Sequence, residues 1–282
     1  MIIWIASYPK SGNTWVRSLL STYFYSKDGS FNFELLKNIK QFPSKKYFEF
    51  FLNDFQDIQK VSEYWIAAQD RINFLNEGPT FLKTHSALCT LGKNSFTNKN
   101  NTKAVIYIVR DPRNIVTSLS HHFSKTIKEA CKFMLTKELM LTKSEFGGDD
   151  FGIATVLGSW AEHYSSWKNL KFAPIIFIKY EDLIKNTNDS LLKIISFLEK
   201  YISVKVDEEK ILKTVKNCAF DRLVDKEKKE GFSEAAKSKI DKKVINFFNL
   251  GKKNNWKDLL DSETEKLIRD TFAREMKELN YL

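Results

Sequence analysis

The chain has 282 residues, a length that suits one large α/β domain or two small ones and is enough to bury a sizeable core. Its content of 43% hydrophobic and 14% aromatic residues is typical of a folded protein and excludes a disordered one. The formal net charge of +10 favours anionic partners such as nucleotides, nucleic acid or membrane headgroups, although a solvated, lysine-rich surface is the simpler explanation.

Several kinds of site and segment are not predicted. The longest apolar runs have the length of a strand and fall far short of the ~20 residues of a membrane helix, so no membrane span is expected. The N-terminus shows no basic leader, and Cys89, Cys131 and Cys218 are far apart, which together predict a cytoplasmic protein with reduced thiols. The four histidines lack the spacing of metal ligands, so no metal is predicted.

The first third of the chain is predicted to begin with a buried strand at residues 2–7, a loop, and a helix from about Thr14 to Tyr25. Residues 28–60 are rich in Phe and Lys with weak periodicity, and we expect an irregular or helical flap there. A helix from Glu63 to Asn76 then leads into a short strand from Thr80 to Lys83.

A polar loop at 92–102 precedes a second buried strand, Lys103–Val109. Asp111 is placed to cap a helix that has Pro112 at its first position and runs to about Ser124. The later elements are, in order, a lysine-rich insertion at 127–152, a helix from Ile153 to Lys171, a strand from Ile175 to Lys179, helices near 181–186, 189–200 and 207–216, a charged segment at 225–243, a loop at 249–255 and a helix from Ser262 to Leu279. Apolar strands that alternate with helices predict one α/β domain over residues 1–282, with a central parallel sheet flanked by helices.

The loop after the first strand reads Tyr8-Pro9-Lys10-Ser11-Gly12-Asn13-Thr14-Trp15. A tight loop between a strand and a helix aims backbone N–H groups at a bound phosphate, and Lys10 adds a positive charge. Gly12 lets the backbone approach a ligand closely, while Ser11, Asn13 and Thr14 supply further donors. The nucleotide-triphosphate loop is excluded because Lys precedes Gly and the first Gly is missing. Taken alone, the segment could equally be an ordinary strand–helix turn.

A second motif begins at Arg110, at the end of a predicted strand, and ends at Ser118 in the following helix. Two helical turns span about 11–12 Å, which lies within the length of a nucleotide. Open α/β sheets bind ligands at the carboxyl ends of parallel strands. Arg110 and Arg113 also form a cluster in a chain with only seven arginines, and Arg binds phosphate in a bidentate way that Lys cannot. Without further support, a structural ion pair is the commoner role for such an Arg.

A third motif, Lys83-Thr84-His85, follows the predicted strand that ends at Lys83. Histidine can accept a proton from a hydroxyl group near neutral pH, and a neighbouring Lys can stabilise developing negative charge. A lone His after a strand is more often a structural hydrogen-bonding residue.

These motifs together resemble those of the cytosolic sulfotransferase family. Residues 7–15 match its P-loop-like, 5′-phosphosulfate-binding loop at nine positions, and Arg110 and Ser118 match the pair that binds the 3′-phosphate. The resemblance implies 3′-phosphoadenosine 5′-phosphosulfate as the co-substrate and transfer of its sulfuryl group without a metal. It also implies that His85 is the catalytic base, while Lys10 and Lys83 neutralise charge on the bridging and peripheral oxygens.

Further positions extend the resemblance and show where it fails. Trp15 and Phe220 resemble the pair of rings that sandwiches the adenine, and Tyr180 resembles the tyrosine that bonds to it. Gly251 and Lys252 lie in the segment that holds the 3′-phosphate in the family. That segment commonly reads Arg-Lys-Gly, but here Asn249 and Leu250 stand in place of the Arg-Lys pair, and Cys218 replaces a common Thr. The short C-terminal dimerisation motif is not recognisable, so homodimer formation stays open.

The acceptor is expected to be the hydroxyl or amine of a small molecule, in a pocket shaped by flaps at 28–60 and 127–155. The phenylalanines Phe31, Phe33, Phe48, Phe50 and Phe51 suggest an apolar acceptor, although they could equally be packing residues. Three alternatives remain: a P-loop small-molecule kinase, a nucleotide-binding relative without transferase activity, and a basic nucleic-acid module. The last is disfavoured because the diagnostic residues gather at strand ends and do not alternate along one face.

Overall fold

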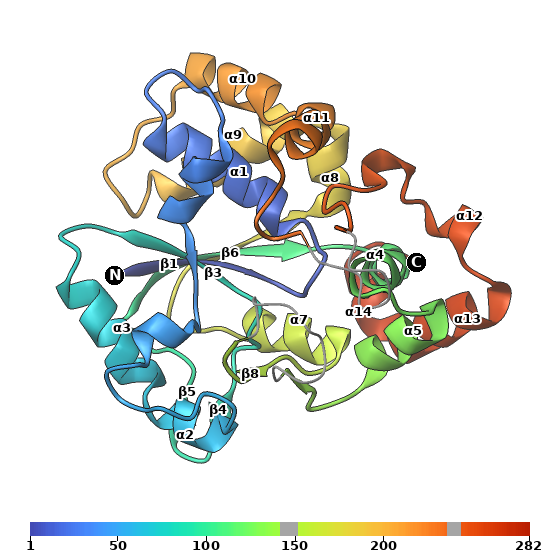
Figure 1. Cartoon of the computed structure of the whole chain (residues 1–282), viewed down its shortest axis with the longest axis horizontal. Coiled ribbons are helices and arrows are strands. Elements are labelled where there is room, and N and C mark those ends of the chain that lie inside the picture. Colours follow the sequence, from blue (N-terminus) through green and yellow to red (C-terminus); the bar gives the residue numbers. More distant parts are fainter. Residues whose placement is uncertain (142–151, 236–243) are drawn as a thin grey trace.

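The computed structural model describes residues 1–141, 152–235 and 244–282. Its centre is a five-stranded sheet in the order β2-β3-β1-β6-β9, shown edge-on in Figure 1. Every neighbouring pair in this sheet is parallel, which confirms the predicted fold class. The strands are β1 (Ile2–Ser7), β2 (Lys40–Gln41), β3 (Thr80–Thr84), β6 (Thr102–Val109) and β9 (Ile175–Lys179).

Two hydrophobic cores lie on opposite faces of the sheet, because successive side chains of a strand point to opposite faces. Along β1, Ile3 and Ile5 enter one core, whereas Ile2 and Trp4 enter the other. The first core is covered by α1 (Asn13–Tyr25), α8 (Tyr180–Lys185), α9 (Thr187–Leu198), α10 (Glu208–Asn217) and α11 (Phe220–Glu230). The second is covered by α3 (Trp65–Phe74), α4 (Pro112–Phe123), α5 (Ile127–Leu135), α7 (Trp160–Lys168), α13 (Ser262–Thr271) and α14 (Ala273–Glu278).

The lysine-rich insertion contains a helix that was not predicted, and the prediction for the segment after it was wrong. Helix α5 lies inside it and begins at a capping box in which Thr126 and Glu129 satisfy each other's backbone N–H groups. The helix predicted from Ile153 begins only at Trp160, after the capping residue Ser159, and Thr155–Val156 forms strand β8 against β7 (Met140–Leu141). Part of the insertion, residues 142–151, lies outside the described residues.

Smaller differences concern loops and helix ends. The flap at 28–60 contains the 3-10 helices η1 (Phe33–Asn38) and η2 (Lys45–Tyr47) and the edge strand β2. The helix predicted from Glu63 is divided at Tyr64 into α2 (Ile58–Glu63) and α3, and the helix predicted from Ser262 is divided into α13 and α14. The polar loop at 92–102 carries part of a small hairpin, β4 (Thr90–Leu91) with β5 (Asn94–Ser95). The C-terminal loop contains η4 (Gly251–Lys253) and is followed by α12 (Trp256–Leu259).

The capping box of α7 gives a stability prediction. The Ser159 hydroxyl accepts the Glu162 N–H at 3.2 Å, and the Glu162 carboxylate accepts the Ser159 N–H at 2.9 Å. We expect Ser159→Ala to lower the free energy of unfolding by about 1 kcal/mol, because alanine lacks the hydroxyl that accepts the Glu162 N–H and donates to the Glu162 carboxylate at 3.0 Å. Urea unfolding measures the change. Ser165→Ala, within the same helix, is the control and should change stability by less than about 0.5 kcal/mol; equal effects would contradict the role of the cap.

Candidate active site

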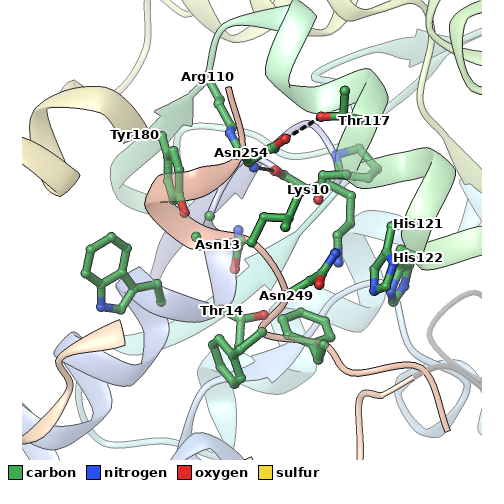
Figure 2. A pocket seen from close by; sticks show the side chains of 18 of the residues that line it. Lys10, Asn13, Thr14, Arg110, Thr117, His121, His122, Tyr180, Asn249 and Asn254 are labelled. Carbon is green, nitrogen blue, oxygen red and sulfur yellow. Dashed lines mark hydrogen bonds between the residues drawn. The ribbon is translucent and has the colours of Figure 1, made fainter. Parts of the chain in front are cut away.

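A pocket opens where β1, β3, β6 and β9 end, at the carboxyl edge of the sheet (Figure 2). Twelve of the predicted site residues line it: Lys10, Gly12, Asn13, Thr14, Trp15, Lys83, His85, Arg110, Ser118, Tyr180, Phe220 and Gly251. Ser11 is fully buried beneath the loop, and the side chain of Lys252 lies outside the described part of the chain.

The loop between β1 and α1 is locked by one close contact. Gly12 has a φ of 99°, and a Cβ at this position would lie 2.4 Å from Cδ2 of Tyr180. Only glycine combines this backbone conformation with such an approach. The loop therefore has its shape because Tyr180, at the end of β9, packs directly on it.

Two buried donor atoms lie in this loop and at the end of β6. Among the described residues, Ser11 Oγ and Arg110 Nε are buried without a hydrogen-bond partner. Asn13 Oδ1 is also unpaired, but as an amide oxygen it can only accept. Each such atom costs about 1–3 kcal/mol when it stays unsatisfied. Because Asn13 begins helix α1, the positive end of that helix also lies here. The residues fit a bound anion with several acceptor oxygens.

Arg110 and Arg113 have different surroundings, although they are close in sequence. The Arg110 guanidinium donates to the Lys10 carbonyl at 2.9 Å and lies 4.2 Å from the centre of the Tyr180 ring. Arg113 instead pairs with Asp111 at 2.8 Å and lies 4.0 Å from the Trp256 ring. Only Arg110 faces the pocket, so Arg113 has the structural role that was the alternative for both.

His85 is buried and fixed by the end of β1. Its Nδ1 lies 2.8 Å from the carbonyl oxygen of Ser7, so a proton on Nδ1 is donated to that oxygen and the lone pair is left on Nε2. Burial, followed by the charge of Lys83, lowers the pKa of His85 well below its ordinary value. The imidazole is therefore neutral at neutral pH and able to accept a proton.

His163, on α7, supports His85 from behind, a role that the sequence did not indicate. Its Nε2 lies 3.1 Å from the carbonyl oxygen of His85, and its Nδ1 lies 2.8 Å from the Tyr107 hydroxyl. Burial lowers the pKa of His163 to about 3. No local pattern around residue 163 could have revealed this contact, because its partners come from distant segments.

The far wall of the pocket is held by asparagines that sequence reasoning also missed. Asn254 accepts a hydrogen bond from Thr117 at 2.6 Å and donates to the Asn114 carbonyl at 2.8 Å, as Figure 2 shows in part. The Asn114 side chain accepts the Trp256 N–H at 2.9 Å. These contacts attach the C-terminal loop to α4 and bring Asn249 and Leu250 to the pocket.

The aromatic residues predicted for adenine meet at one end of the pocket. The Trp15 and Phe220 ring centres are 6.1 Å apart at 74°, so the two rings now pack edge to face. A purine would contact their edges or separate them. The phenylalanines singled out between residues 31 and 51 do not line this pocket; His121, His122, Phe123 and Phe247 border it instead. In Figure 2 the two histidines lie opposite Tyr180.

A glycine-containing loop at a helix start, a buried neutral histidine and several aromatic side chains thus gather at the carboxyl edge of a parallel sheet, where open α/β proteins bind ligands. The sulfotransferase domain family matches residues 2–280. The chain therefore belongs to the sulfotransferase family, which confirms the assignment drawn from the motifs. Among the described residues, no helix is both long and apolar enough to cross a membrane.

Individual relatives are distant. An amine sulfotransferase of Oryctolagus cuniculus is 29% identical over 224 residues, covering 78% of this chain and 62% of that protein. The luciferin sulfotransferase of Photinus pyralis is 25% identical over 227 residues, covering 78% of this chain but 55% of that protein. The match thus spans less than two thirds of either relative. A mouse sulfotransferase complexed with PAP has the same fold, with a TM-score of 0.57 at 22% identity over 99% of this chain and 85% of that one.

The buried histidines give a pH prediction. An unfolded histidine titrates near pH 6.5, whereas burial lowers the pKa of His163 to about 3. Below about pH 6.5 the unfolded chain therefore binds a proton that the folded chain does not, and the free energy of unfolding falls as the pH falls. Each such histidine contributes up to about 1.4 kcal/mol per pH unit in this range.

His163→Gln tests this prediction, because glutamine cannot take up the proton but keeps a donor for the His85 carbonyl. Urea unfolding between about pH 5 and pH 7 should show a smaller loss of stability in the variant than in the wild type. An unchanged pH dependence would show that His163 is not held neutral by the fold.

Proposed function

We propose that this pocket binds 3′-phosphoadenosine 5′-phosphosulfate and transfers its sulfuryl group to a hydroxyl or amine of a small acceptor. The observation that carries this proposal is the convergence of Lys10, Lys83, His85 and Arg110 on one pocket from three parallel strand ends. Membership of the sulfotransferase family supports the reaction, and the PAP bound in the mouse sulfotransferase supports the donor.

The donor would lie along the line from the first loop to α4. The 5′-phosphosulfate would accept hydrogen bonds from backbone N–H groups at the start of α1, from the Ser11 hydroxyl, which is unpaired among the described residues, and from Thr14. Arg110 and Ser118 would hold the 3′-phosphate. Trp15, Tyr180 and Phe220 would contact the adenine, since their rings border the same pocket.

The transfer itself would be an in-line displacement. The acceptor oxygen or nitrogen forms a bond to sulfur while the bond from sulfur to the bridging phosphate oxygen breaks. Nε2 of His85 takes the acceptor proton, and adenosine 3′,5′-bisphosphate leaves with the bonding electrons. Lys10 and Lys83 stabilise the charge that develops on the bridging and peripheral oxygens. Positioning and electrostatics provide most of the rate, as in phosphoryl transfer.

The segment at residues 249–250, which borders the pocket, lacks the two cations that the family commonly has there. Asn249 and Leu250 are uncharged and stand in place of Arg and Lys. Lys253 is exposed and does not border the pocket. We therefore propose that Arg110 and Ser118 bind the 3′-phosphate without a cation at these two positions.

The base assignment is tested with His85→Ala. We expect transfer from radiolabelled donor to a panel of phenols, alcohols and amines to fall at least about 100-fold, because the variant lacks the imidazole assigned to take the acceptor proton. Binding of adenosine 3′,5′-bisphosphate, measured by calorimetry, should stay within about threefold of wild type, since His85 contacts the acceptor and not the nucleotide. Full transferase activity in this variant would contradict the assignment.

Lys10→Ala tests the donor loop. We expect both loss of transfer and at least roughly tenfold weaker binding of adenosine 3′,5′-bisphosphate, because a charge-assisted contact is lost. Lys99→Ala removes an equal charge from an exposed loop residue and serves as the control. Tighter calorimetric binding of ATP than of the bisphosphate by the wild type would instead favour a kinase.

A further inference from the structure

Glu234 places a carboxylate among the cationic groups at the start of α1. One oxygen, Oε1, lies 2.7 Å from Nη1 of Arg17. The other, Oε2, accepts a hydrogen bond from the Thr14 hydroxyl at 3.3 Å and lies 3.6 Å from Nζ of Lys83. Only 18% of the Glu234 side chain is exposed. Burial opposes its ionisation, yet Lys83 and Arg17 hold the pKa of Glu234 at about 2, so the group is charged at neutral pH.

Two of these three partners belong to the proposed donor site. Thr14 and Lys83 line the pocket and would contact the 5′-phosphosulfate, whereas Arg17 does not line it. Arg17 is instead fixed by hydrogen bonds to the carbonyl oxygens of Leu36 at 3.3 Å and Ile39 at 3.0 Å. Glu234 itself does not line this pocket, but its Oε2 engages two groups that do, whereas Oε1 is held by the structural partner Arg17.

We propose that Glu234 is a built-in competitor of the donor, because in the donor-free protein its Oε2 engages the Thr14 hydroxyl and the Lys83 ammonium, which a 5′-phosphosulfate oxygen would otherwise use. This inference rests on the proposed function. Donor binding requires Oε2 to leave Thr14 and Lys83, and Oε1 can keep its contact with Arg17 as this happens. The competition acts only on ligands that carry an anion at the 5′ position.

A contact of Phe247, which like Glu234 follows helix α11, also supports the proposal. The Phe247 ring lies 4.1 Å from Nζ of Lys10, so the other cation assigned to the sulfuryl group is also covered. The Glu227 carboxylate accepts the N–H groups of Phe247 and Phe248 at 2.6 and 2.9 Å and fixes them to α11. Both lysines of the proposed reaction are therefore engaged by residues that follow or adjoin α11.

The test compares Glu234→Gln with the wild type by calorimetry. Glutamine keeps the size of the side chain and an oxygen for Arg17, but it lacks the negative charge. We expect adenosine 3′,5′-bisphosphate to bind about tenfold more tightly to the variant, because the competing charge is gone. Adenosine 3′-monophosphate, which lacks the 5′ anion, should bind equally to both proteins. Glu230→Gln is the control, since Glu230 is exposed and pairs only with Lys226 among the described residues.

Each outcome separates the inference from the proposed function. Wild-type affinity, or weaker binding, of the bisphosphate by Glu234→Gln would overturn the inference alone. The same gain for the 3′-monophosphate would also overturn it, because a general opening of the pocket and not competition would then be at work. Failure of every protein to bind the bisphosphate would overturn the donor assignment and the inference with it. Glu234→Ala, with circular dichroism to verify folding, should reproduce the gain.

Discussion

The ring of Tyr180 joins the ends of three parallel strands, and the pocket depends on this contact. On one side the ring meets the backbone of Gly12, where a Cβ would lie at 2.4 Å. Arg110 also packs on the ring, at 4.2 Å, and donates to the Lys10 carbonyl. The loop after β1, the end of β6 and the end of β9 thus fix one another. The side chains at these strand ends are placed accurately because their positions do not depend on a loop alone.

The sequence was sufficient for four of the five strands of the sheet, all except the edge strand β2, and for most of the pocket lining. Strand-length apolar runs and the loop at residues 8–15 are local patterns, and both were predicted close to their observed bounds. The starts of α5 and α7 were missed although each has the sequence of a capping box, Thr126 with Glu129 and Ser159 with Glu162, so a closer use of that pattern would have found them.

Other features could not be predicted from local patterns. His163 contacts His85 across 78 positions of sequence, Asn254 contacts Asn114 across 140, and Glu234 contacts Thr14 across 220. Each of these residues is common in exposed positions, and its role depends only on which segments the fold brings together. The same reasoning explains why Arg113 looked like a phosphate ligand: its partners Asp111 and Trp256 make it structural, and Trp256 lies far along the chain.

The burial of Lys83 gives a reason for the carboxylate of Glu234, the proposed competitor, to lie beside the proposed donor site. The Lys83 side chain is only 4% exposed, and an unpaired charge at such a depth is costly. Without Glu234, the buried ammonium group of Lys83 would be unpaired whenever the donor is absent. In the proposed exchange, a phosphosulfate oxygen would replace Glu234 Oε2, so an anion would lie beside Lys83 in both states. It would also lie near His85, whose pKa is lowered by burial and Lys83 and raised by Glu234. The proposed base would therefore keep a neighbouring negative charge when the donor replaces the carboxylate.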